Sequence, residues 1–151
     1  MDFEHLKISN QLCFKIYSAS RTMIRLYKPI LDKLKLTYPQ YITMLVMWEK
    51  EVIPFKELSN KLKLKTGTLT PIIDKLVKLG YIIKIKDKKD DRKLLVELTD
   101  EGRELKAEAL KVPSEIACKT SLDKDKYVKY MEMMDDLLGK LNEAEKDKWG
   151  E

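Results

Sequence analysis

Hydrophobic side chains recur every three or four residues over several stretches of the chain, which is the spacing of amphipathic helices. The first stretch covers about residues 4–34, and Pro29 is expected to kink it or to end its first part. A second stretch begins at Thr37 and is apolar nearly all round from Tyr41 to Trp48, as in a buried helix. The pattern therefore predicts two helices in the first third of the chain.

Two short helices are predicted next. Pro54 opens the first, which runs through Leu62. Thr66 is expected to be the N-cap of the second, and Gly80 stands where a left-handed residue commonly ends a helix. Two short helices in close succession are typical of a helix-turn-helix.

A β-hairpin is predicted after the second short helix. The runs 81–86 and 93–98 favour strands, and the segment between them is polar. Thr99 then caps a further helix that ends before Pro113, and a last helical stripe begins at Asp123. The fold class is therefore mainly α with a small β-hairpin wing, a winged helix-turn-helix flanked by N- and C-terminal helices.

The composition excludes several classes of protein. With 151 residues and 44% hydrophobic side chains the chain can bury a core, so intrinsic disorder is not its main state. Two cysteines without an apolar N-terminal signal predict a reducing compartment, and we expect a cytoplasmic protein whose thiols are free at rest. The longest uncharged run, Leu36–Trp48, is too short to span a bilayer, so no membrane partner is expected.

Positive charge is concentrated in the middle of the chain. Residues 54–93 carry 12 Lys and Arg against 5 Asp and Glu, a balance of +7, whereas residues 94–151 carry 10 against 15. A charged run is usually a solvated face, but this asymmetry is one that can hold a polyanion. The predicted helix-turn-helix and hairpin are therefore the candidate functional region.

The second short helix has an apolar stripe centred on Leu69 and Leu76 and an opposite face that is polar, small and basic. That face consists of Gly67, Thr70, Pro71, Asp74, Lys75 and Lys78, with Thr68 at its edge. A helix-turn-helix docks such a face in the DNA major groove, and a basic hairpin beside it can reach the backbone or the minor groove. Any soluble amphipathic helix has a solvated side, so it is the hairpin and the local charge that favour DNA binding.

Two motifs in this region resemble the MarR family of winged-helix transcription regulators: Thr66-Gly67-Thr68-Leu69-Thr70-Pro71 and, in the hairpin, Asp90-Asp91-Arg92. The resemblance implies that Asp90 orients Arg92, which enters the minor groove. It also implies that Thr66, Thr68 and Lys75 contact major-groove bases or phosphates. The full set of candidate DNA-binding residues is Lys65, Thr66, Thr68, Thr70, Lys75, Lys86, Lys88, Lys89, Asp90 and Arg92.

The N-terminal part narrows the resemblance to the organic-hydroperoxide-sensing OhrR branch of that family. The segments that carry it are Asn10-Gln11-Leu12-Cys13-Phe14-Lys15-Ile16-Tyr17, Tyr27-Lys28-Pro29 and Thr37-Tyr38-Pro39-Gln40-Tyr41. The resemblance implies that Cys13 is a peroxide-sensing thiol and that Tyr27 and Tyr38 hydrogen-bond it across a dimer interface. Tyr17 matches a further tyrosine of the sensor pocket.

The helical spacing is compatible with this role but does not establish it. Cys13, Tyr17, Ser20, Ile24 and Tyr27 fall on one helix face, so a thiol and hydroxyl groups can share a stripe. A free cysteine on such a stripe is more often a small hydrophobic core residue. Hydrogen bonds to a thiolate favour the ionised form, which is the nucleophile, and tyrosine hydroxyls are suitable donors.

Cys118 is the second candidate redox residue. It follows Val112-Pro113-Ser114-Glu115-Ile116-Ala117, and two-cysteine members of the OhrR branch resemble this pattern. The resemblance implies that Cys13 is oxidised to sulfenic acid and then forms a disulfide with Cys118 of the partner subunit. The alternative is an incidental cysteine, with a small-molecule thiol resolving the sulfenic acid.

We therefore expect a homodimeric, non-enzymatic transcriptional repressor that binds a pseudo-palindromic double-stranded operator and releases it when organic hydroperoxide oxidises Cys13. Residues 1–36 are expected to form a dimerisation and sensor helix, residues 37–98 the winged helix-turn-helix DNA-binding domain, and residues 99–151 C-terminal dimerisation helices, all in one integrated fold. No cofactor or metal is expected. His5 is the only histidine, and no Cys-x-x-Cys or His-x-x-x-His spacing is present.

Three alternatives remain open from the sequence. A MarR-type regulator released by a small phenolic ligand would use Cys13 and the tyrosines only as pocket walls. A thiol peroxidase would use Cys13 and Cys118 in turnover, although the chain lacks a thioredoxin-like pattern and the basic segment would be unexplained. A protein-binding winged helix would show little of the salt dependence of DNA binding.

Overall fold

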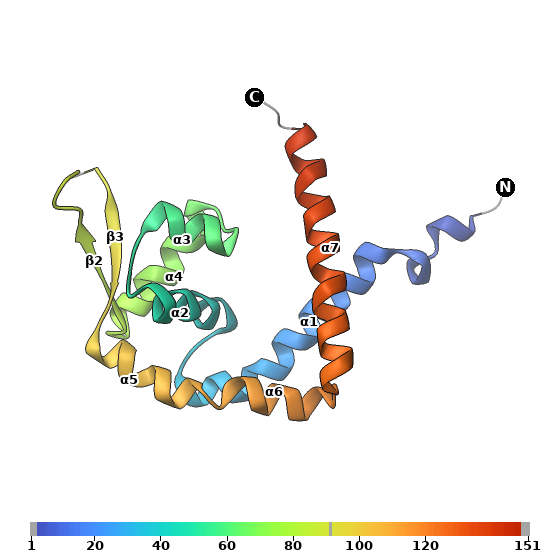
Figure 1. Cartoon of the computed structure of the whole chain (residues 1–151), viewed down its shortest axis with the longest axis horizontal. Helices are drawn as coiled ribbons and strands as arrows, with labels where there is room; N and C mark the ends of the chain where they lie inside the picture. The colour runs from blue at the N-terminus through green and yellow to red at the C-terminus, as the bar shows by residue number, and fades with distance from the viewer. Residues whose placement is uncertain (1–2, 91, 149–151) are drawn as a thin grey trace. The chain divides into compact units, whose positions relative to one another are not determined.

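The computed structural model describes residues 3–90 and 92–148, and the chain divides into two compact units, residues 1–116 and 117–151. Figure 1 traces the helices and strands along the chain. Their bounds, in chain order, are η1 (Glu4–Leu6), η2 (Ile8–Asn10), α1 (Leu12–Leu31), η3 (Asp32–Leu34), α2 (Tyr38–Lys50), β1 (Val52–Pro54), α3 (Phe55–Leu62), α4 (Thr66–Lys78), β2 (Ile82–Lys86), β3 (Leu94–Leu98), α5 (Asp100–Ala109), α6 (Val112–Thr120) and α7 (Lys124–Lys148).

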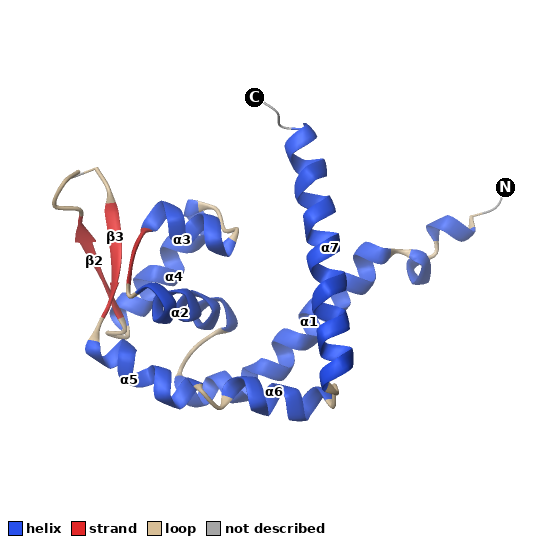
Figure 2. Cartoon of the chain, in the orientation of Figure 1, coloured by secondary structure: helices blue, strands red, loops and turns tan. Residues whose placement is uncertain are grey.

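The first unit contains a winged helix-turn-helix, which confirms the predicted fold class. A three-stranded antiparallel sheet in the order β1-β3-β2 lies beside α2, α3 and α4 (Figure 2). The predicted hairpin is formed by β2 and β3, with Ile82 opposite Leu98 and Lys86 opposite Leu94. Strand β1 was not predicted, because three residues that include Pro54 are too short to show an alternating pattern.

The buried stripe of α4 fixes this helix in the fold. Leu69, Ile73 and Leu76 have no solvent exposure, and they belong to the same core cluster as Ile82 and Val96 of the sheet. Their spacing of three and four residues is the periodicity predicted from the sequence. Because this stripe is buried, the opposite face of α4 is left toward solvent.

Helix α2 begins where the sequence predicts. Thr37 and Gln40 form a capping box, in which the Thr37 backbone N–H donates to Oε1 of Gln40 at 2.8 Å. Most of the helix is then buried, as its nearly uninterrupted apolar sequence requires; the buried residues are Gln40, Tyr41, Thr43, Met44, Met47 and Trp48.

Helix α4 begins differently from the prediction. Thr66 was expected to be the N-cap, but it is the first helical residue, and Lys65 occupies the extended N-cap position without a side-chain hydrogen bond. The hydroxyl of Thr70 donates to the Thr66 carbonyl at 2.8 Å, one turn back. The end of the helix is as predicted, because Gly80 has φ 80 and its N–H donates to the Val77 carbonyl at 2.9 Å.

The N-terminal stretch is not one helix over residues 4–34. Two 3-10 turns precede α1, which begins at Leu12, and a third 3-10 turn follows it. Pro29 neither ends the helix nor breaks it, because α1 continues to Leu31. The missing backbone N–H of Pro29 removes one hydrogen bond close to the helix end, where the effect on the remaining helix is small.

The start of α5 is hydrogen-bonded to the turn that follows α4. The Thr99 hydroxyl accepts from the Gly102 N–H at 3.0 Å, as the prediction of a cap requires, and it donates to the Gly80 carbonyl at 2.6 Å. Nε1 of Trp48 donates to the Gly102 carbonyl at 2.8 Å in a buried bond. Helices α2 and α5 are therefore joined by a polar contact within the core.

The second unit consists of the end of α6 and the long helix α7. The predicted break near Pro113 is present, since α5 ends at Ala109 and α6 begins at Val112. The apolar stripe of α7 is largely exposed in the single chain, including Tyr127, Met131, Met134, Leu138 and Leu141. Among the described helices, none combines the length and hydropathy needed to cross a membrane.

We predict that Gly102→Ala destabilises the fold. A Cβ at this position would lie 2.2 Å from the Tyr81 carbonyl oxygen and 2.7 Å from Cδ1 of Leu98, so backbone must shift. The expected loss in the free energy of unfolding is about 1–3 kcal/mol, measured by urea denaturation. Gly67→Ala is the control, because nothing lies within 4 Å of a Cβ there and the helix should be stabilised slightly. Equal stability of the two variants would contradict the prediction.

Candidate nucleic-acid interface and cysteine site

The exposed face of α4 carries the residues predicted for the major groove. Thr66, Gly67, Thr68 and Lys75 are exposed, while Thr70 is half-buried. Lys65 is exposed as well, in the extended residue that precedes the helix. The structure therefore places the five candidate residues of this segment, Lys65, Thr66, Thr68, Thr70 and Lys75, on or next to one helix.

A basic groove lies at the turn between α3 and α4. It has a volume of about 540 Å³ and is lined by Lys56, Ser59, Asn60, Lys63, Leu64, Lys65 and Thr66. Sequence reasoning singled out Lys65 and Thr66 but missed Lys56, Asn60 and Lys63. The excess of positive charge in residues 54–93 was the signal that could have pointed to the two lysines among them. The groove suits an anionic backbone better than an apolar ligand.

The tip of the wing is organised by Asp90. Its Oδ1 accepts from the backbone N–H of Arg92 at 3.2 Å and from Nε of the same residue at 3.1 Å. The Arg92 side chain is 92% exposed, whereas that of Asp90 is 28% exposed. Lys86, Lys88 and Lys89 around it are also exposed. Asp91, the middle residue of the motif, lies outside the described residues.

Hydrogen bonding to Arg92 lowers the pKa of Asp90 below its ordinary value, through the side-chain bond first and the backbone bond second, with a smaller charge effect from Lys93. The carboxylate is therefore ionised and holds the guanidinium through its Nε, while the Arg92 side chain stays 92% exposed. This arrangement presents a fixed cation at the tip of the hairpin, which can enter a narrow groove of negative potential.

A second ion pair connects the exposed face of α4 with strand β2 of the sheet. Oδ1 of Asp74 on α4 accepts a hydrogen bond from Nζ of Lys84 on β2. Asp74 is the only acidic residue in α4, and the sequence alone assigned it no partner. The structure shows that it neutralises a lysine of the wing.

Cys13 is exposed and free, in the first turn of α1. Tyr17, one turn further along, is exposed too, and Nη1 of Arg21 donates to its hydroxyl oxygen at 2.8 Å. The Arg21 guanidinium also lies 5.3 Å from the centre of the Tyr17 ring. The first part of α1 thus presents a thiol, a phenol and a cation along an exposed stretch.

The other two sensor candidates lie together, apart from Cys13. The rings of Tyr27 and Tyr38 meet edge to face at 5.1 Å, and Tyr27 lies 5.9 Å from Tyr41. Burial raises the pKa of Tyr41, and the nearby Tyr38 contributes to the same direction. Tyr27 is fourteen residues after Cys13 on the same helix, about 21 Å along its axis. A single chain therefore does not bring Cys13 to this tyrosine pair.

A largely apolar hollow lies beside Tyr38. It encloses about 270 Å³ and is lined by Ile24, Arg25, Lys28, Leu31, Asp32, Leu36, Thr37, Tyr38 and Pro39. Its walls come from the second half of α1, from η3, and from the segment that leads into α2 together with the start of that helix. The space fits a small apolar or aromatic group rather than a highly charged one.

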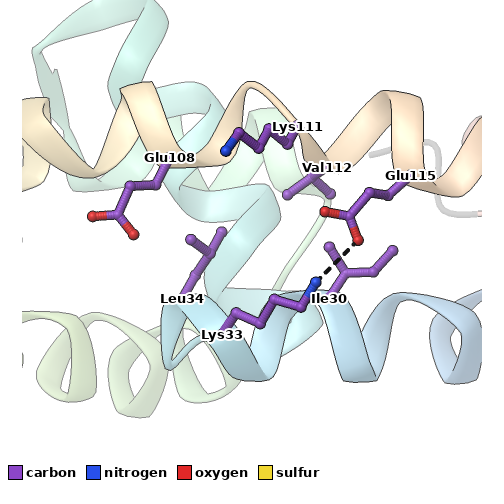
Figure 3. A pocket seen from close by; sticks show the side chains of 7 residues that line it. All are labelled: Ile30, Lys33, Leu34, Glu108, Lys111, Val112 and Glu115. Carbon is purple, nitrogen blue, oxygen red and sulfur yellow. Dashed lines mark hydrogen bonds and ion pairs between the residues drawn. The ribbon is translucent and has the colours of Figure 1, made fainter.

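Another hollow, of about 250 Å³, lies between the end of α1 and the α5–α6 junction (Figure 3). Ile30, Leu34 and Val112 form its apolar wall. Nζ of Lys33 and Oε2 of Glu115 form an ion pair of 3.3 Å across it. Sequence reasoning did not find this contact, because its partners are 82 residues apart.

Cys118 is exposed and free near the end of α6, in the second unit. Its position is three residues after Glu115 on the same helix. In the residues that the structure describes, no group of three or more His, Cys, Asp or Glu side chains could hold a metal ion.

Comparison with known proteins shows which proteins this chain is similar to. Residues 25–109 match the family model described as "Transcriptional regulator SarA/Rot". The chain is 43% identical over 114 residues to the organic hydroperoxide resistance transcriptional regulator of Bacillus subtilis (strain 168), covering 76% of this chain and 78% of that protein.

Solved structures also align with most of this chain. The structure of reduced AbfR bound to DNA, AbfR being a Staphylococcus epidermidis protein, aligns with a TM-score of 0.81 and 27% identity, covering 95% of this chain and 99% of that one. The structure of disulfide-formed AbfR aligns with a TM-score of 0.62 and 28% identity, covering 93% and 94%.

The contact at the wing predicts how Asp90 titrates. In Arg92→Gln the pKa of the Asp90 carboxyl should rise toward its ordinary value, measured by carboxyl carbon shifts against pH. Because the pKa of Asp90 is lower in the folded chain than in the unfolded chain, the contact is present above the unfolded value and lost as pH falls through the folded value. Lys93→Gln is the control and should move the carboxyl less. An Asp90 titration unaffected by Arg92→Gln would disprove the hydrogen-bonded wing.

Proposed function

Because the chain belongs to the MarR-type winged-helix transcriptional regulators, in the SarA/Rot family and the branch of the organic hydroperoxide resistance regulator, we propose that it is a homodimeric repressor whose operator binding is lost on oxidation of Cys13. The observation that carries the DNA-binding part is the exposed face of α4 beside a basic wing in which Asp90 holds Arg92. The chain is a regulator rather than an enzyme, which argues against the thiol peroxidase alternative.

The DNA-binding roles follow from where the side chains lie. In the proposed complex α4 enters the major groove, so that Thr66, Thr68 and Lys75 meet base edges or phosphates. Lys65 and Thr70 support this contact from the start of the helix. The wing places Arg92 in the minor groove, while Lys86, Lys88 and Lys89 neutralise phosphates around it. Two such domains would grip half-sites roughly 10 bp apart or a multiple of it.

Exposed apolar side chains support the homodimer. On α1, Leu12 is 61% exposed, and Phe14, Met23 and Ile24 are exposed as well. On α7, in the second unit, the exposed apolar stripe runs from Tyr127 to Leu141. Apolar helix faces of this extent are seldom left to solvent in a monomer. A second copy of the chain, offering the same faces, would cover them with two-fold symmetry.

The sensor part of the proposal requires that second copy. Cys13 lies about 21 Å along α1 from Tyr27 of its own chain, so the hydroxyls that stabilise its thiolate would come from Tyr27 and Tyr38 of the partner subunit. Tyr17, on the same helix as Cys13, completes the proposed pocket. The apolar hollow beside Tyr38 supports an organic hydroperoxide rather than H₂O₂ as the oxidant.

The proposed chemistry has two steps. The Cys13 thiolate attacks the terminal oxygen of the hydroperoxide, the O–O bond breaks, and the alkoxide leaves and takes a proton to become an alcohol. The thiolate is oxidised to sulfenic acid and the hydroperoxide is reduced. The thiolate of Cys118 of the partner subunit then attacks the sulfenic sulfur, an S–S bond forms, and hydroxide leaves as water. The new bond biases the dimer toward a form with altered wing spacing.

We predict loss of DNA affinity on oxidation. The probe is the duplex that the reduced full-length protein enriches from a random-sequence pool, called the selected duplex below. One equivalent of cumene hydroperoxide should weaken binding to it by about 5- to 150-fold, measured by fluorescence anisotropy. Cys13→Ser should bind equally well before and after the oxidant.

Three outcomes of that experiment would contradict the proposal in different ways. Release of DNA by oxidised Cys13→Ser would remove the sensor role of this cysteine. Failure to enrich any sequence would remove DNA binding. Release under strict reduction by a phenolic acid such as 4-hydroxybenzoate would assign the ligand-released alternative.

A second prediction concerns Cys118. After the same oxidation, a non-reducing gel should show a dimer-sized band that disappears with reductant and is absent in Cys118→Ser. Intact mass of oxidised Cys118→Ser should show one added oxygen per chain, because the sulfenic acid at Cys13 lacks its resolving thiol. A dimer-sized band that persists in Cys118→Ser would eliminate the two-cysteine mechanism.

A further inference from the structure

The ion pair between Asp74 and Lys84 joins the two elements proposed to contact DNA. Asp74 lies on the exposed face of α4, next to Lys75 and one turn before Lys78. Asp74 nevertheless forms its ion pair with Lys84, which belongs to β2 at the base of the wing. The two residues are only ten positions apart, but a turn around Gly80 reverses the chain between them. The contact therefore links α4 directly to β2.

The position of Lys84 on its strand explains why it reaches back to the helix. Side chains alternate along a strand, so Lys84 shares a sheet face with Ile82, whose side chain is fully buried. Its neighbour across the ladder is Val96, which is also fully buried. The Lys84 side chain is accordingly 32% exposed, and its ammonium reaches the carboxylate of Asp74. Lys86, two residues further on the same face, is exposed.

We propose that Asp74 is a positioning residue of the DNA-binding surface: its ion pair with Lys84 sets the orientation of the wing relative to α4 and thereby determines how strongly the chain prefers its operator over other DNA. The inference rests on the proposed DNA-binding function. Neither side chain contacts DNA in this role, although both belong to the surface that faces it.

The physical basis is that specific and non-specific binding depend on different features. Specific binding requires base-edge contacts from α4 and the wing contact at the same time, whereas non-specific binding requires mainly positive charge near phosphates. Without the ion pair the wing is less firmly oriented relative to α4, and only specific binding to the operator depends on that orientation. Loss of Asp74 also removes a negative charge and releases Lys84 toward the phosphates, which strengthens non-specific binding. The two affinities should therefore move in opposite directions.

The first test is Asp74→Ala, with the reduced full-length protein, the selected duplex and a scrambled duplex of the same composition. Affinity for the selected duplex should fall about 3- to 20-fold, since an exposed pair contributes up to about fivefold and a dimer holds two copies. Affinity for the scrambled duplex should rise. Glu57→Ala on α3 is the matched control, because it removes an exposed carboxylate and should leave the ratio of the two affinities unchanged.

The second test compares two lysines on one face of β2. Lys84→Met should reproduce the loss of affinity for the selected duplex while leaving the salt dependence unchanged, because Lys84 makes no phosphate contact in the intact protein. Lys86→Met should reduce the slope of log affinity against log salt by about 1 and weaken both duplexes alike. The double variant Asp74→Ala/Lys84→Met should lose no more than the larger single loss, as expected for one shared interaction.

Three results would overturn the proposal. If Asp74→Ala strengthened binding to both duplexes equally, the only effect of Asp74 would be to repel DNA. Affinities for both duplexes that Asp74→Ala leaves unchanged would remove the positioning role. A salt slope reduced in Lys84→Met as in Lys86→Met would make Lys84 a phosphate contact. If instead no duplex is enriched by the unaltered protein, the proposed DNA-binding function fails.

Discussion

Burial of one stripe of α4 is the constraint on which the rest of the structure depends. Leu69, Ile73 and Leu76 can leave water only by packing in the core shared with α2 and the sheet. Once they do so, the orientation of the opposite face is no longer free, and its threonines and lysines must face solvent together. The sheet that completes this core also projects the wing beyond it. The same hydrophobic contacts thus stabilise the fold and orient the surface proposed to bind DNA.

Polar contacts then hold the turns and the wing tip, whose positions hydrophobic burial alone does not determine. The Thr99 hydroxyl bridges Gly80 and Gly102, so the turn after α4 and the first turn of α5 share one hydrogen-bonded point. Asp90 plays a comparable part at the tip of the wing, where it holds Arg92 without covering the guanidinium. These are short-range bonds between groups close in space, and each restricts a segment that has little core of its own.

The sequence was informative wherever structure is decided locally. Helical periodicity found α4, a start signal and a nearly uninterrupted apolar run found α2, two β-favouring runs around a polar segment found the β2–β3 hairpin, and Thr99 marked the start of α5. Prediction from the sequence failed where an element depends on partners distant in the chain. It also failed where an element has too few residues to show a pattern. Strand β1 has three residues and pairs with a strand some 45 positions later, the N-cap of α4 moved by one residue, and the 3-10 turns before α1 gave no separate pattern.

The candidate site divides in the same way. The exposed residues of α4 and the Asp90–Arg92 contact followed from motifs, because neighbouring residues make them. The pairing of Asp74 with Lys84, the basic groove at Lys56 and the Lys33–Glu115 contact did not, because each requires a particular packing of two elements. The roles of Cys13 and Cys118 stay predictions, since their proposed partners belong to another copy of the chain.

The continuous helix between Cys13 and Tyr27 has a consequence for how such a chain can evolve. Fourteen residues make nearly four helical turns, so the thiol and the ring project from almost the same side of α1. Inserting or deleting a single residue between them would rotate one by about 100° relative to the other and shift it by about 1.5 Å. In the proposed dimer a change in the length of this segment would alter both the angle and the distance between the thiol and the ring, whereas a substitution would leave this spacing unchanged. The proposed pocket therefore fixes the number of residues between Cys13 and Tyr27 as well as the identity of the two side chains.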